Sequence, residues 1–169
     1  MWPASTLQHV LVPITGAAAL GCGIMAGLLF AFSAFVMRAL ERIPVPEGIR
    51  AMQAINVTIV TPLFLTVFLG TALASILLAV VAWAPAVAPA ARYLLLSASL
   101  LYLVGVIGVT AVFNVPLNDA LAGKNPDSAE AARFWLGYVA TWTAWNHVRT
   151  AAALGSTGAF MFALRALAL

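Results

Sequence analysis

The residues best suited to chemistry form the run Asn-His-Val-Arg-Thr at positions 146–150, inside the last apolar segment of the chain. An imidazole accepts a proton near neutral pH, a guanidinium stabilises negative charge, and an amide both donates and accepts hydrogen bonds. On a helix, Asn146, Arg149 and Thr150 share one face and His147 lies at its edge. The run therefore predicts a site for proton transfer and anion stabilisation on that face.

Amides and aromatic rings elsewhere in the chain can complete such a site. Asn56 lies at the start of the second apolar segment, whereas Asn114 and Asn118 lie at the end of the third. The residues predicted to be catalytic are His147, Arg149 and Asn146, and those predicted to bind substrate are Asn56, Asn114, Asn118, Trp142, Trp145 and Thr150. Several of these residues also have a purely structural explanation. The asparagines can be helix caps and turn formers. Arg149 can be an arginine whose side chain reaches to the membrane interface, and His147 can be a packing residue.

Sequence signatures of cofactor sites are absent. The chain has no Gly-rich phosphate loop, no Gly-x-Ser-x-Gly, no His-x-x-x-His and no Cys-x-x-Cys. A site with two histidine ligands is not expected, because His9 and His147 are the only histidines and the topology predicted below puts them on opposite sides of the membrane. We therefore expect no metal and no cofactor; a mononuclear site built from His147 and Asp119 is the alternative.

The composition is that of a membrane protein. Hydrophobic residues make up 64% of the 169 residues and charged residues only 8%, whereas soluble domains carry about 25% charged residues. The apolar runs are long and uninterrupted, which favours helices over a closed barrel as the way to satisfy the backbone in lipid. The lipid bilayer is thus an expected partner. Nucleic acid is not, because the net charge of +3 comes from scattered residues.

We predict an all-α, integral membrane four-helix bundle that forms one domain over residues 1–169. The expected helices cover about residues 10–40, 47–83, 90–113 and 128–168. Pro62 falls inside the second of these helices and predicts a kink there. Asp127 and Glu130 have the spacing of a capping box at the start of the last helix.

The positive charges predict an orientation in the membrane. The loops after the first and third helices hold five of the basic residues, namely Arg38, Arg42, Arg50, Lys124 and Arg133, whereas the second loop and the two ends hold Arg92 and Arg165. The positive-inside rule then places these two loops in the cytoplasm and both termini outside, in an inner or cytoplasmic membrane.

Small residues in the first segment include the step Gly23-x-x-x-Gly27. Such steps let two helix backbones approach closely in lipid, either within one bundle or between two copies. We expect packing within the bundle and leave a homo-oligomer open.

The residues considered above also carry a family resemblance. The strings Phe-Ser-x-x-Val-Met-Arg-Ala-Leu (32–40), Ala-Met-Gln-Ala-Ile-Asn (51–56), Phe-Asn-Val-Pro-Leu-Asn-Asp (113–119) and Trp-x-x-x-Asn-His-Val-Arg-Thr (142–150) resemble those of the anthrone oxygenase-like integral membrane family, formerly a domain of unknown function. The resemblance extends over essentially the whole chain, and the last two strings are its most specific part. Characterised fungal members of that family convert anthrones to anthraquinones with O₂, without a metal or flavin.

The resemblance implies a membrane-embedded, cofactor-independent oxygenase that acts with O₂ on a small lipophilic aromatic substrate, anthrone-like or phenolic. His147 would remove a proton from the acidic carbon, and Arg149 with Asn146, Asn114 or Asn118 would stabilise the enolate oxygen. The enolate would react with O₂ and collapse through a hydroperoxide to a quinone. Three alternatives remain: a non-enzymatic protein that binds or transports a lipophilic molecule, a membrane assembly protein whose asparagines join helices, and an enzyme with a bound metal or haem.

Overall fold

The computed structural model of the chain describes residues 4–168, and these residues form helices and no strands. The first helical stretch consists of α1 (Ala4–Ala31), a π-helical segment η1 (Phe32–Val36) and α2 (Met37–Arg42). The helices α3 (Val45–Thr58) and α4 (Pro62–Val81) follow. The third stretch comprises α5 (Pro89–Leu100), η2 (Leu101–Gly108), η3 (Thr110–Asn114) and α6 (Val115–Ala122). The last helix is α7 (Ala129–Leu167).

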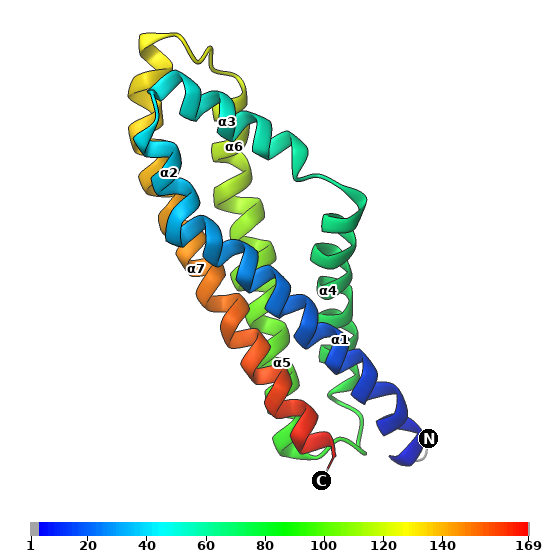
Figure 1. Cartoon of the computed structure of the whole chain (residues 1–169). Coiled ribbons are helices and arrows are strands. Elements are labelled where there is room, and N and C mark those ends of the chain that lie inside the picture. Colours follow the sequence, from blue (N-terminus) through cyan, green and yellow to red (C-terminus); the bar gives the residue numbers. More distant parts are fainter. Residues whose placement is uncertain (1–3, 169) are drawn as a thin grey trace.

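Four stretches within the described residues are long and apolar enough to cross a membrane: Gln8–Arg42, Pro62–Val81, Pro89–Ala122 and Ala129–Leu167. They run side by side as an elongated bundle, with both described ends of the chain at one end of the molecule (Figure 1). The predicted all-α fold with four membrane-spanning helices is therefore confirmed. Which end faces the cytoplasm, and whether residues 1–169 form a single domain, stay predictions.

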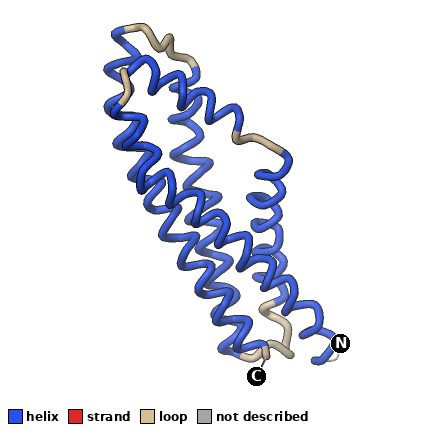
Figure 2. The backbone as a smooth tube through the Cα atoms, in the orientation of Figure 1, coloured by secondary structure: helices blue, strands red, loops and turns tan. Residues whose placement is uncertain are grey.

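The second predicted helix is divided in the structure. The chain leaves the helical conformation after α3, and Thr61 is extended, with φ −103° and ψ 156°. Because proline disfavours a helical conformation in the residue before it, Pro62 begins α4 rather than kinking a continuous helix. The side chain of Thr61 caps the new helix by accepting a hydrogen bond from the Phe64 N–H at 3.2 Å. As a result, α3 lies across one end of the bundle while α4 runs along it (Figures 1 and 2).

The ends of the other helices also differ from the predicted ones. The third stretch continues past Pro116 to Ala122, because Asn114 and Val115 before the proline keep helical dihedral angles. Ser128, not Asp127, caps α7: its hydroxyl accepts a hydrogen bond from the Ala131 N–H at 3.1 Å. The expected capping box is thus wrong. Asp127 instead pairs with Arg50, across the exposed end of the bundle.

Candidate functional site

A layer of polar residues separates two apolar cores inside the bundle. One core includes Leu29 of α1, Val106 of η2 and Ala153 of α7, and the other includes Met37, Leu121 and Trp142. Between them lie buried polar side chains from three helical stretches: Ser33, Asn114, Asn146, Arg149 and Thr150. A polar layer at this depth is costly unless its groups satisfy one another, so its hydrogen bonds decide what it can do.

Two π-helical segments supply the partners that face α7. Ser33 belongs to η1, and Thr110 and Asn114 belong to η3. A π turn holds one more residue than an α turn and is frequent at functional sites. In this chain η1 and η3 coincide with the polar layer, whereas the π-helical segment η2 packs in the apolar core.

Arg149 is the only buried cation among the described residues. Its Nη1 donates to Thr110 Oγ1 at 3.2 Å, and its Nη2 donates to Asn146 Oδ1 at 2.7 Å. The guanidinium carbon lies 5.1 Å from the centroid of the Trp142 ring, within reach of a cation–π interaction. These contacts hold the guanidinium in one orientation at the level of the polar layer.

Asn146 orients Arg149 through a side-chain amide whose nitrogen and oxygen both form hydrogen bonds. Its Nδ2 donates to the carbonyl of Leu29 and to Ser33 Oγ, both at 2.7 Å. Its Oδ1 is occupied by Arg149. Asn146 is completely buried and therefore ties α7 to α1 and η1 while it orients the cation.

Within the part of the chain that the structure describes, Arg149 has no carboxylate partner. The ion pairs found among the described residues are Arg50–Asp127 and Lys124–Glu130, both at the end of the bundle where α3 and the loop before α7 lie. In addition, Arg149 Nε and Asn114 Oδ1 are buried without a hydrogen-bond partner. A buried cation and unpaired polar atoms in one layer indicate a place for a polar ligand or water.

Arg149 forms part of the wall of a cavity of about 430 Å³, which lies among α1, α3, α4, α6 and α7. This volume is in the usual range for small-molecule sites. The wall is mostly apolar and includes Met25, Leu28, Leu29, Phe32, Met52, Ile55, Val57, Ile59, Val60, Phe64, Leu65, Phe68, Leu69, Val115, Ala122 and Trp142. The polar residues in it are Gln53, Asn56, Thr110, Asn118, Asp119 and Arg149. We call this space the main cavity.

Asn118 anchors α6 to α7 beside the main cavity. Its Oδ1 accepts hydrogen bonds from Tyr138 Oη at 3.0 Å and from Trp142 Nε1 at 2.8 Å. An indole N–H can only donate, so the amide must present its oxygen to α7. The amide nitrogen of Asn118 is then available to a ligand in the cavity.

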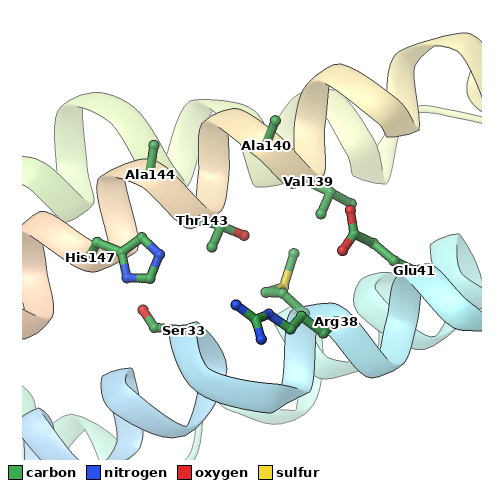
Figure 3. Close-up of a pocket in the computed structure, with 9 residues that line it drawn as sticks. Ser33, Arg38, Glu41, Val139, Ala140, Thr143, Ala144 and His147 are labelled. Atoms are coloured by element: carbon green, nitrogen blue, oxygen red, sulfur yellow. The ribbon is translucent and has the colours of Figure 1, made fainter.

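His147 lines a second cavity of about 270 Å³, which lies between α7 and the stretch from η1 to α2. Figure 3 shows His147, Arg38 and Ser33 pointing into the space between the two helices, with Glu41 at the other end. His147 is exposed, whereas its neighbour Asn146 is buried. The second cavity is thus on the other side of α7 from the guanidinium of Arg149.

Comparison with protein families settles the relationship that the sequence strings suggested. A family model described as anthrone oxygenase matches residues 63–159, more than half of the chain. The chain belongs to the anthrone oxygenase family. The matched segment runs from α4 into α7 and contains both Asn118 and Arg149. Membership supports an oxygenase-like function at the level of the family. No curated protein and no solved structure matches the chain.

The structure divides the residues that were predicted for an anthrone oxygenase site. Arg149, Asn56, Asn118 and Trp142 line the main cavity, and Asn146 supports Arg149 from behind. The other predicted residues do not line the main cavity. His147 faces the second cavity, and Trp145 stacks on Phe113 with ring centroids 3.5 Å apart. Asn114 donates a hydrogen bond to the Trp142 carbonyl, and Thr150 donates one to the Asn146 carbonyl. A substrate held against Arg149 therefore does not meet His147 in this arrangement.

Three polar residues of the main cavity, Gln53, Thr110 and Asp119, were not predicted as part of an oxygenase site. Gln53 donates to the carbonyls of Leu121 and Lys124. Thr110 lies one helical turn before Asn114 in an apolar stretch, and this spacing was the signal that could have found it. Asp119 was considered only as a metal ligand together with His147. The structure places these two residues in different cavities, and the described residues contain no group of three or more His, Cys, Asp or Glu side chains placed to hold a metal.

Proposed function

We propose that this member of the anthrone oxygenase family oxidises a flat, lipophilic, phenolic or anthrone-like molecule directly with O₂ in the main cavity, without a cofactor. The observation that carries the proposal is the guanidinium of Arg149, which is buried, has no carboxylate partner among the described residues and lines an apolar cavity. Such a site favours a substrate that is neutral on arrival and anionic in the reaction.

The electrostatics of Arg149 fit an oxyanion. Interactions between charges are stronger in a water-poor interior than in water, so an enolate oxygen beside the guanidinium gains more than a neutral carbonyl does. An interaction that strengthens as charge develops lowers the barrier instead of merely tightening binding. Hydrogen-bond donors that are already oriented before the reaction contribute most to stabilising the transition state. Thr110 and Asn146 hold the guanidinium of Arg149 in such an orientation.

The walls of the main cavity support the assignment of the substrate class. Phe32, Phe64 and Trp142 offer aromatic surfaces, and most of the other apolar lining residues are aliphatic or methionine. Two of the lining residues, Val57 and Val60, are themselves 78% and 60% exposed. The cavity thus reaches the outer apolar surface, which supports access of an aromatic molecule and of O₂ from the lipid.

The proposed reaction converts a methylene group into a carbonyl. A base removes one proton from the carbon, and the resulting enolate passes an electron to O₂; recombination forms a C–O bond and, after protonation, a hydroperoxide. Here the protonation that gives the hydroperoxide uses the first proton. Loss of the second proton from the same carbon then breaks the O–O bond and releases hydroxide, which this second proton converts to water. The sum is one methylene and one O₂ giving one ketone and one water, so no external reductant is needed.

Oxidation of dithranol, a simple anthrone, tests the proposal. Purified protein in detergent or nanodiscs should consume O₂ with dithranol, and Arg149→Leu should lower the rate by about 10²–10³-fold, as removal of an oxyanion donor does. Ala122→Phe should block the main cavity, whereas Ala120→Phe, on the same helix but outside the cavity wall, should not. Tight binding with no turnover in any lipid environment would instead favour a non-enzymatic carrier of lipophilic molecules.

A further inference from the structure

The proposed oxidation needs a proton acceptor in the cavity that holds Arg149. The described wall of the main cavity contains no histidine, and its one carboxylate is Asp119. We propose that Asp119 is the catalytic base, taking the proton from the substrate carbon whose enolate oxygen Arg149 stabilises. This inference rests on the proposed function and replaces the role that the sequence assigned to His147.

Hydrogen bonds of the neighbouring residue set the position of Asp119. Val115, Asn118, Asp119 and Ala122 occur at helical spacing on α6 and all line the main cavity. The two hydrogen bonds from Tyr138 and Trp142 to Asn118 fix how α6 is rotated against α7. With Asn118 held in this way, the next residue is also held at the cavity wall.

Asp119 and Arg149 line one cavity but do not form an ion pair. Opposite charges that share an apolar cavity without meeting leave room for a molecule between them. A ketone with an acidic C–H group suits this arrangement, because its oxygen would lie at the cation while its carbon faces the carboxylate. If Asp119 and Arg149 formed an ion pair, the carboxylate would not be free to accept a proton and the guanidinium would not be free to stabilise the enolate oxygen.

Asp119 also has the properties of a proton carrier. Its side chain is exposed, in contrast to the buried Arg149, so it can exchange protons with water at the end of the bundle. A carboxylate is a competent base for carbon acids when an oxyanion site stabilises the enolate, as in ketosteroid isomerase. The proton held on Asp119 would then protonate the peroxide, as the balance of the reaction requires.

Deuterium exchange under nitrogen isolates this step from the chemistry of O₂. Wild-type protein in deuterated buffer should exchange the methylene protons of dithranol, followed by mass spectrometry, faster than buffer alone. Asp119→Asn has nearly the same shape and should lower the exchange rate by about 10²-fold or more, the usual contribution of a general base. Asp119→Glu should restore part of it. Asp127→Asn, an exposed carboxylate near the same end, should exchange like wild type.

The outcomes separate the two proposals. Wild-type exchange with Asp119→Asn unaffected and His147→Gln inactive would overturn the role of Asp119 and leave the oxygenase proposal standing. Exchange that depends on Asp119 without any O₂ consumption would support the base and overturn the oxygenase proposal. A wild-type protein that neither exchanges nor oxidises dithranol would overturn both. Circular dichroism of each variant shows whether the fold is retained.

Discussion

Asn146 Oδ1 lies 2.7 Å from Arg149 Nη2, one helical turn away on α7. The same asparagine donates to the Leu29 carbonyl and to Ser33 Oγ, so the orientation of the cation depends on how α7 is attached to the first helical stretch. Packing of these helices and chemistry at Arg149 are therefore linked through one amide.

Replacement of Asn146 by alanine should affect both stability and activity. The change removes one buried hydrogen bond each from the Leu29 carbonyl, Ser33 Oγ and Arg149 Nη2, so we expect a loss of about 1–3 kcal/mol in unfolding free energy. Loosening of the guanidinium should lower turnover of dithranol by about tenfold or more. Thermal unfolding in detergent and O₂ consumption measure the two effects.

A double-mutant cycle distinguishes the link from a general loss of fold. If Asn146 acts through Arg149, the combined Asn146→Ala and Arg149→Leu variant should turn over no more slowly than Arg149→Leu alone. Independent, multiplying losses in the cycle would contradict a positioning role for Asn146.

Lysine at position 149 separates charge from geometry. Lys keeps the positive charge but lacks the planar fork that contacts both Thr110 and Asn146. We expect the kcat of Arg149→Lys to lie between those of wild type and Arg149→Leu, with KM for dithranol changed less than kcat. Equal activity of the lysine and leucine variants would show that a positive charge at position 149, without the geometry of the guanidinium, contributes nothing to turnover.

The sequence was sufficient to predict the membrane-spanning helices and the composition of one helix face. Trp142, Asn146, Arg149 and Thr150 are all buried, as the helical periodicity indicated. This worked because α7 is one uninterrupted α-helix, in which residue spacing translates directly into direction.

The arrangement of the site could not be predicted in the same way. The third helical stretch passes through η2 and η3, and a π turn changes the angle per residue, so the directions of Asn114 and Asn118 do not follow from α-helical spacing. The break at Thr61 moved α3 across the bundle end and formed a wall of the main cavity. Which side of α7 faces that cavity, and hence the separation of His147 from Arg149, depends on these tertiary features.

Close helix contacts make a further prediction about stability. A Cβ added at Gly105 of η2 would collide with the Ala152 side chain of α7, whereas one added at Gly70 of α4 meets nothing within 4 Å. Gly105→Ala should therefore destabilise the bundle by about 1–3 kcal/mol through overpacking. Gly70→Ala should be neutral or stabilising, because alanine is favoured over glycine in a helix by about 1 kcal/mol. Thermal unfolding of the two variants under the same detergent conditions is the comparison, and equal melting temperatures would contradict the predicted contact.

Cysteine labelling tests the predicted orientation in the membrane. Cys22 is completely buried and can be replaced by alanine to give a background without thiols. Asn125 in the loop before α7 and Ala86 in the loop before α5 are both exposed, and each can carry a single cysteine. If the loops rich in Lys and Arg face the cytoplasm, a membrane-impermeant maleimide added to intact cells should label Ala86→Cys and leave Asn125→Cys unmodified. Inside-out vesicles should give the reverse pattern. The opposite result in both preparations would place the termini in the cytoplasm.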